Sequence, residues 1–238
     1  MSSKSETGHA NNAANFETII SFCTAYGESY KPNRESLKLD SLNDLLTKSR
    51  NSLNEVTTAK NQYDLIVNER QIAFAKLRTT STRIVNALDA TDASDEAVAD
   101  AKSINKKIQG KRVSEKPGES EETKTISTSQ QSYDSLVVNY SKLIDLISAE
   151  PSYAPNEPEL ITGTLTTYMF ELRGANTKVI NAYTVYSNAM IARDKVLYAK
   201  DTGLVDTAFE VKKYVKSVFG AASPEYKQIS GLGFTRPR

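Results

Sequence analysis

The sequence predicts an all-α fold, an elongated helical bundle built from a tandem duplication. Residues 37–88 contain neither proline nor glycine, and apolar side chains recur through them at the three- and four-residue spacing of one helix face. A second segment, residues 160–219, repeats this pattern. We therefore expect two long helices with coiled-coil-like seams, flanked by shorter helices that cover their apolar stripes.

The two segments match each other without a gap at an offset of 123 residues, the difference between positions 153 and 30. The match begins at a Tyr-x-Pro-Asn corner that occurs twice. The matched pairs are Tyr30 and Tyr153, Pro32 and Pro155, Asn33 and Asn156, Leu37 and Leu160, Leu42 and Leu165, Arg50 and Arg173, Val56 and Val179, Ala59 and Ala182, Tyr63 and Tyr186, and Arg70 and Arg193. We expect both repeats to share one core, because a lone helical hairpin buries too little surface.

The domain organisation follows from composition. The expected order is a flexible tail at residues 1–12, a first helical repeat at 13–109, a linker at 110–126, a second helical repeat at 127–230 and a basic tail at 231–238. The first tail is rich in serine and asparagine and offers no apolar face to bury. The linker contains a polar run with proline and glycine, which interrupts helices.

In the first repeat, a helix over about residues 13–28 should end before Pro32, which lacks an N–H and disfavours helical geometry in the residue before it. Asn33 would then cap the first long helix. After that helix, Ser94 is a suitable N-cap for a short helix over about residues 95–109, because acidic residues follow it in the first turn.

In the second repeat, a helix over about residues 127–149 precedes the second corner and the second long helix. Asn156 is again the expected cap. Gly203 should kink that helix or split it in two, and Gly220 should end it. Ser223 and the proline after it predict a final short turn of helix.

Nothing in the sequence indicates catalysis. The only histidine, His9, lies in the expected tail, and the only cysteine, Cys23, sits among apolar residues as a buried thiol without a histidine beside it. The pair Gly231 and Gly233 follows no strand and opens no helix, so it is no phosphate-binding loop. We therefore expect a protein that is not an enzyme, with no catalytic, cofactor-binding or metal-ligating residues and no cofactor.

The expected location is the cytoplasm. No apolar run approaches the roughly 20 residues needed to span a bilayer, and the first residues lack the apolar centre of a signal peptide. A single cysteine excludes an internal disulfide. The net charge of +1 gives no overall attraction to nucleic acid or to anionic lipid.

Four polar residues on the long helices form the first candidate site. Tyr63 and Arg70 lie two turns apart on the seam of the first long helix, and Tyr186 and Arg193 repeat them on the second. In an antiparallel pair, Tyr63 would lie opposite Arg193 and Arg70 opposite Tyr186. Stacking of each pair, worth about 0.5–2 kcal/mol, would act as a structural register lock. In the alternative, each arginine lies at the edge of the stripe, pairs with a neighbouring carboxylate and reaches water.

Basic and aromatic residues at the C-terminal end form the second candidate site, a contact for an anionic partner. Its cations are Lys212, Lys213, Lys216, Lys227, Arg236 and Arg238. The alternative is that lysines are common at helix C-termini, where they oppose the helix dipole, and that short basic tails are common too.

The chain also resembles an uncharacterised group of duplicated all-helical bacterial proteins. The resemblance rests on the paired Tyr-x-Pro-Asn corners, on Thr82-Arg-Ile-Val-Asn-Ala-Leu88, and on Tyr214-Val-Lys-Ser-Val-Phe-Gly220 with Ser223-Pro-Glu-Tyr-Lys227. It covers most of the chain beyond the first tail. The resemblance implies a bacterial origin and a helical fold, and it carries no functional residue, because the group has no assigned activity.

The expected function is that of a non-catalytic helical scaffold or protein-interaction module, either self-associating or binding another protein. One alternative is a binder of nucleic acid or another anionic partner through the basic, aromatic C-terminal end. Another is a membrane-active helical-bundle protein, although the sequence lacks an apolar hairpin to insert into a bilayer.

Overall fold

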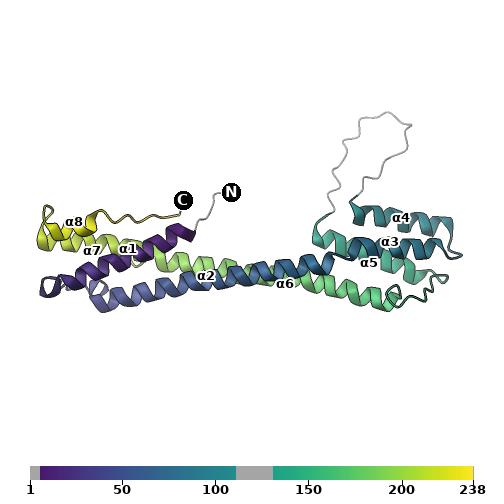
Figure 1. Ribbon diagram of the computed structural model, residues 1–238, viewed down its shortest axis with the longest axis horizontal. Helices are drawn as coiled ribbons and strands as arrows, with labels where there is room; N and C mark the ends of the chain where they lie inside the picture. The colour runs from purple at the N-terminus through teal and green to yellow at the C-terminus, as the bar shows by residue number, and fades with distance from the viewer. Residues whose placement is uncertain (1–5, 111–130, 238) are drawn as a thin grey trace, which may run out of the picture. The chain divides into compact units, whose positions relative to one another are not determined.

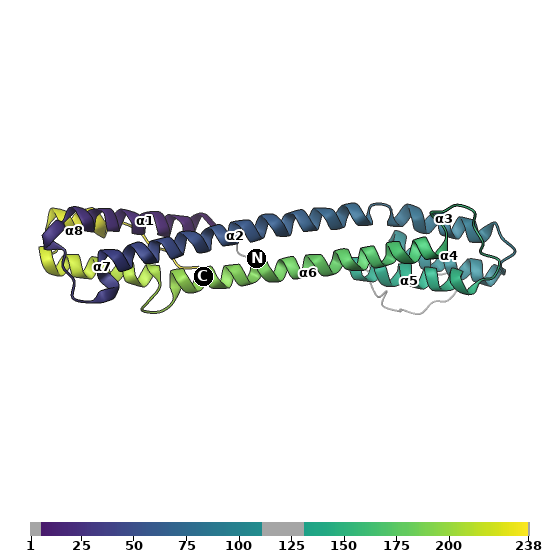
Figure 2. The ribbon, with the colours of Figure 1, turned by 90° about the horizontal axis from the view of Figure 1, so that it is seen from below.

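The computed structural model describes residues 6–110 and 131–237, and all regular structure in these ranges is helical, which confirms the all-α class. The excluded residues contain most of the expected linker, the start of the expected first tail, and Arg238. The helices (Figures 1 and 2) are α1 (Glu6–Ala25), η1 (Gly27–Ser29), η2 (Glu35–Leu37), α2 (Leu39–Phe74), α3 (Leu77–Asp89), α4 (Asp95–Gln109), α5 (Tyr133–Ala149), α6 (Thr162–Tyr198), α7 (Leu204–Phe219) and α8 (Pro224–Ser230).

The chain forms two compact units, each with its own core. Unit 1 comprises residues 1–63 and 183–238, and unit 2 comprises residues 64–182. Helices α2 and α6 each contribute one part to each unit. The expectation of one shared core is therefore wrong: there are two cores, and each is built from segments of both expected repeats.

The core of unit 1 lies between α1, the start of α2, and α7. Its fully buried members include Phe16, Ile19, Cys23, Leu42, Leu197, Leu204, Ala208, Val211, Val215 and Ile229. The C-terminal segment, residues 231–237, is joined to α1: the Asn12 side chain donates to the Thr235 carbonyl at 2.7 Å and accepts from the Thr235 N–H at 3.0 Å. The described part of the expected basic tail is thus packed against unit 1.

The N-terminal segment also differs from the expected flexible tail, because residues 6–12 belong to α1. His9 is buried, and its Nδ1 lies 2.7 Å from the Tyr198 hydroxyl. Polar residues here are buried because Tyr198 and the C-terminal segment give them hydrogen-bond partners. Those partners are distant in sequence, so composition alone could not place them.

Unit 2 packs α3, α4, α5 and parts of the two long helices. Its fully buried members include Leu77, Ile84, Leu88, Ala101, Ile108, Tyr140, Leu143, Ile147, Leu165 and Leu172. Ser94 caps α4 as expected, since its side chain accepts the Ala97 N–H at 3.2 Å. Gly110 ends α4 in the left-handed conformation, which favours glycine.

Both long segments are broken, and only one break was expected. Residues 37–88 form two helices, because the Ala75 N–H bonds the Ile72 carbonyl in a tightened turn at 3.1 Å, between α2 and α3. The second segment splits at Gly203, as expected. A Cβ there would lie 2.6 Å from the Ala199 nitrogen, so the turn requires glycine.

The two tyrosine corners have the same internal bond. The Tyr30 hydroxyl donates to the Leu37 carbonyl at 2.7 Å, and the Tyr153 hydroxyl donates to the Leu160 carbonyl at 3.0 Å. The asparagines of the corners are not the caps of the long helices, which begin later, at positions 39 and 162. These starts are also 123 residues apart, since 162 − 39 = 123. The duplication stays a prediction, and it accounts for this agreement.

Candidate interaction surfaces

The first candidate surface is an uncharged face of α6 in unit 1. Residues 183–192 contain no charged side chain. Val185, Asn188, Ile191 and Ala192 are all exposed, and their spacing of three and four residues places them on one side of the helix. We call these four residues the outer face. Val185 is 61% exposed and Ile191 is 53% exposed, which is unusual for large aliphatic side chains.

The opposite side of this part of α6 faces α2. The Tyr63 ring lies 5.8 Å from the Tyr183 ring and 6.1 Å from the Tyr186 ring, measured between centroids. Figure 2 shows the two helices running alongside each other in this part of unit 1. We call residues 53–63 and 183–193 the two-helix segment.

The two-helix segment has almost no core of its own. Among its residues, only Val56 and Arg193 are buried. Helices in proteins are stabilised mainly by packing of an apolar face, and two helices alone cover little of each other. This part of unit 1 therefore has apolar surface without a covering element in the chain's described residues.

The four residues of the expected register lock have different surroundings. Tyr63 stacks on Tyr186 with the ring planes 16° apart. The Arg193 guanidinium donates to Asp194 Oδ1 at 2.8 and 3.0 Å, which is the carboxylate contact of the alternative interpretation. Arg193 is buried, however, so it does not reach water as that alternative expected. The register lock itself stays a prediction.

Arg70 has an aromatic partner that the sequence did not suggest. In unit 2, its Cζ lies 3.9 Å from the centroid of the Tyr133 ring, at the start of α5. The expectation placed the cation-π partners of both arginines on the long helices. Tyr133 lies outside the repeated seam, so the heptad spacing carried no signal for it.

Two residues of the basic end hold the C-terminal segment in place. Lys212 is buried, and its Nζ donates to the carbonyls of Ser230 at 3.2 Å and Leu232 at 2.5 Å, while burial lowers the pKa of its ammonium group. Arg236 pairs with Asp206. These two cations contact the protein itself, whereas Lys227 is exposed.

A cavity of about 790 Å³ lies beside α7 in unit 1. Its wall includes the cations Arg34, Lys200, Lys212, Lys213 and Lys216, the carboxylates Asp201, Asp206 and Glu210, and the rings of Phe209 and Tyr226. The basic-end prediction included Lys212, Lys213 and Lys216. It missed the other two cations because their sequence positions are far from the C-terminal end, and only folding brings them to this wall.

The buried reactive groups do not form a site. Cys23 is a free, buried thiol, and burial raises its pKa to about 12, so it is a poor nucleophile at neutral pH. Within residues 6–110 and 131–237, no group of histidine, cysteine and carboxylate side chains is placed to hold a metal ion. In the same ranges, no helix combines the length and the apolar character needed to cross a membrane.

Comparisons with protein-family models, with curated proteins and with solved structures give no match to this chain.

Proposed function

We propose that this protein is a non-catalytic helical scaffold that associates with a second copy of itself through the outer face of α6. The observation that supports the proposal is the uncharged, exposed outer face on a two-helix segment that has almost no core. A second copy would add an identical helix pair and would complete a four-helix arrangement around both apolar stripes.

The composition of the outer face favours a second copy over an unrelated partner. Symmetric dimers bury the same patch from both subunits, so the patch must be complementary to itself. A face without charge meets this condition, because no like charges are brought together. A single asparagine in an apolar helical seam also favours one register, since it pairs with a polar partner across the seam. Asn188 occupies that position here.

The test is the mass of the full chain in solution, measured by sedimentation velocity over a range of micromolar concentrations. We expect a rise from the 26.2 kDa of one chain towards twice that mass. Ile191→Glu should keep the chain monomeric, because burying an unpaired carboxylate from each copy is costly. Thr58→Glu, an exposed position on α2, is the matched control and should associate like the unchanged chain. A constant mass of one chain at all concentrations would refute the proposal.

A crosslinking experiment tests the contact itself. If the outer faces meet symmetrically, Asn188→Cys should crosslink to its counterpart with a short bismaleimide, while Cys23 stays buried and unreactive. Thr58→Cys should not crosslink. Equal crosslinking at both positions would show collisions rather than a specific face.

A second candidate function is the binding of nucleic acid or another anionic partner at the basic end. The observation in its favour is that Lys213 and Lys216 lie on the wall of a cavity instead of pointing to separate surfaces. Copurification of nucleic acid, released by added salt, would support it, because phosphate contacts weaken steeply as salt rises. Absence of any salt-sensitive binding to single- or double-stranded oligonucleotides would exclude it.

A further inference from the structure

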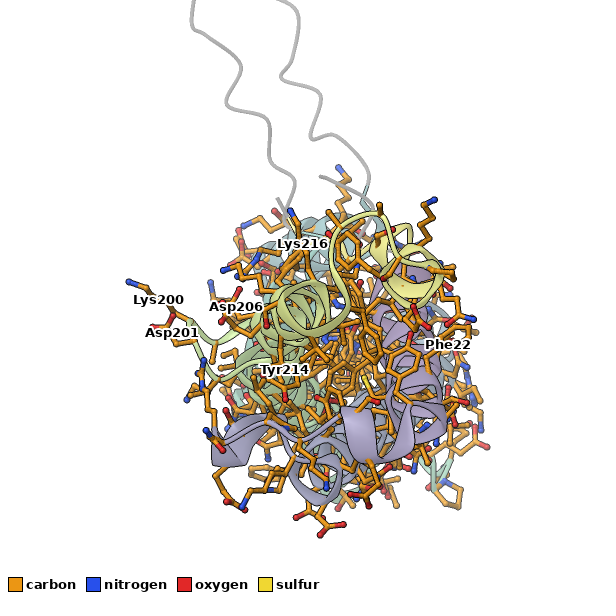
Figure 3. The ribbon with its side chains drawn as sticks, turned by 90° about the vertical axis from the view of Figure 1, so that its left-hand side faces the viewer. Phe22, Lys200, Asp201, Asp206, Tyr214 and Lys216 are labelled. Carbon is orange, nitrogen blue, oxygen red and sulfur yellow. The ribbon has the colours of Figure 1, made fainter. Side chains whose placement is uncertain are left out.

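Hydrogen bonds hold the turn between α6 and α7, which forms one side of the cavity beside α7. In the turn between α6 and α7, the Asp201 N–H donates to Asp206 Oδ2 at 2.9 Å, and the Gly203 N–H donates to the Ala199 carbonyl at 2.8 Å. Asp201 has a φ of 64°, the one positive value at a non-glycine residue in the described ranges. Figure 3 shows Lys200, Asp201 and Asp206 together on one side of unit 1, away from Phe22. The turn therefore holds Lys200 at the wall.

Two of the three carboxylates in the wall are already neutralised. Asp206 accepts the Asp201 N–H and pairs with Arg236, and these contacts hold its pKa below the usual value. Glu210 pairs with Lys213 at 2.8 Å and lies 3.6 Å from Arg34. An anion entering the cavity would thus meet little repulsion from these two side chains.

Two lysines of the wall are available to a ligand. Lys200 and Lys216 have no carboxylate partner within residues 6–110 and 131–237, and the Lys216 Nζ lies 5.8 Å from the centroid of the Tyr226 ring. The wall has five cations against three carboxylates, which leaves an excess of two positive charges.

We infer that this cavity binds a small polyanion that carries several phosphate groups, such as tripolyphosphate or a nucleoside triphosphate. The volume of about 790 Å³ lies within the roughly 300–1,000 Å³ typical of small-molecule sites. Lysine ammonium groups and an arginine are the side chains that bind phosphate. The rings of Phe209 and Tyr226 give the wall flat apolar surface for a planar group attached to the phosphates. The inference deepens the second candidate function and rests on it only in taking an anion as the ligand.

The experiment is calorimetric titration of the full chain with tripolyphosphate and with ATP at low salt. We expect saturable binding to one site, weakened at physiological ionic strength. The double variant Lys200→Gln with Lys216→Gln should lose at least about tenfold in affinity, equivalent to about 1.4 kcal/mol. Lys48→Gln, an exposed position on α2 outside both the cavity and the basic end, is the control and should bind like the unchanged chain. Circular dichroism checks that each variant folds.

The outcomes separate this inference from the proposals above. Absence of saturable binding of both probes, or equal losses in the double variant and the control, would overturn it. If a single-stranded oligonucleotide binds more tightly than ATP and only Lys227→Gln weakens it, the anionic partner is nucleic acid on the outer surface, and the cavity inference fails. Sedimentation of the same samples reports on self-association independently.

Discussion

Replacing Tyr30 by phenylalanine should destabilise unit 1 by about 1–3 kcal/mol. The substitution removes only a hydroxyl, which is buried and donates to the Leu37 carbonyl at 2.7 Å. The ring remains, and so does its edge-on contact with Tyr214 at 5.3 Å between centroids. The loss should therefore be that of one buried hydrogen bond, including the cost of leaving the carbonyl without this donor.

The second corner offers a matched variant in unit 2. The Tyr153 hydroxyl donates to the Leu160 carbonyl at 3.0 Å, and the two tyrosines are similarly buried, at 6% and 8% exposure. If the corners are copies of one structure, Tyr153→Phe should cost unit 2 about as much as Tyr30→Phe costs unit 1. Tyr183→Phe is the control: its ring is 52% exposed, so the change should stay within about 0.5 kcal/mol.

Hydrogen exchange measured by mass spectrometry is the suitable assay, because two cores need not unfold together and exchange reports the opening of each region separately. Tyr30→Phe should lower protection in α1 and α7, and Tyr153→Phe should lower it in α5 and the start of α6. A loss below about 0.5 kcal/mol for both variants would refute the reasoning, since the hydroxyls would then contribute little beyond the packing of their rings.

Three further predictions concern single positions. The Cys23 thiol should resist thiol reagents in the native protein and react once denaturant is added. Burial raises its pKa from the usual 9.0 to about 12, so the fold favours the protonated thiol. The free energy of unfolding should therefore fall as pH rises between these two values. Arg70→Met should change the free energy of unfolding, measured in urea, by no more than about 1 kcal/mol. The lost stacking on Tyr133 is offset because the substitution removes a buried Nε that has no hydrogen-bond partner in the described residues. The register lock instead requires a loss above about 3 kcal/mol. Gly203→Ala should lower the melting temperature, since the added Cβ would lie 2.6 Å from the Ala199 nitrogen; an unchanged melting temperature would show that this turn adapts.

Local signals in the sequence were sufficient for most helices and for some of their ends. Ser94 before acidic residues and Ser223 before a proline both act as caps in the structure. Gly203 marks the break between α6 and α7. These features depend on backbone chemistry within a few residues, and that chemistry is visible in the sequence.

Features that depend on distant partners were missed. No proline or glycine occurs at the break after Phe74, so the residue types there did not indicate it. His9 is buried because Tyr198 lies beside it, and composition alone indicated a tail. For the candidate sites, the basic and aromatic composition of the C-terminal end predicted Lys213 and Lys216, but Arg34 reaches the same wall only through the fold.

Each unit is built from segments of both expected repeats, and this explains why the expectation of one core was wrong. The expected first repeat contributes α1 and the start of α2 to unit 1, but its later helices α3 and α4 to unit 2. The expected second repeat contributes α5 and the start of α6 to unit 2, but α7 and α8 to unit 1. Each repeat alone therefore holds two half-cores, and neither half buries enough apolar surface to be stable. Pairing the early part of one repeat with the late part of the other completes both cores. In the two-helix segment of unit 1, only Val56 and Arg193 are buried, so the outer face lies on a part of α6 that the core of this unit does not reach.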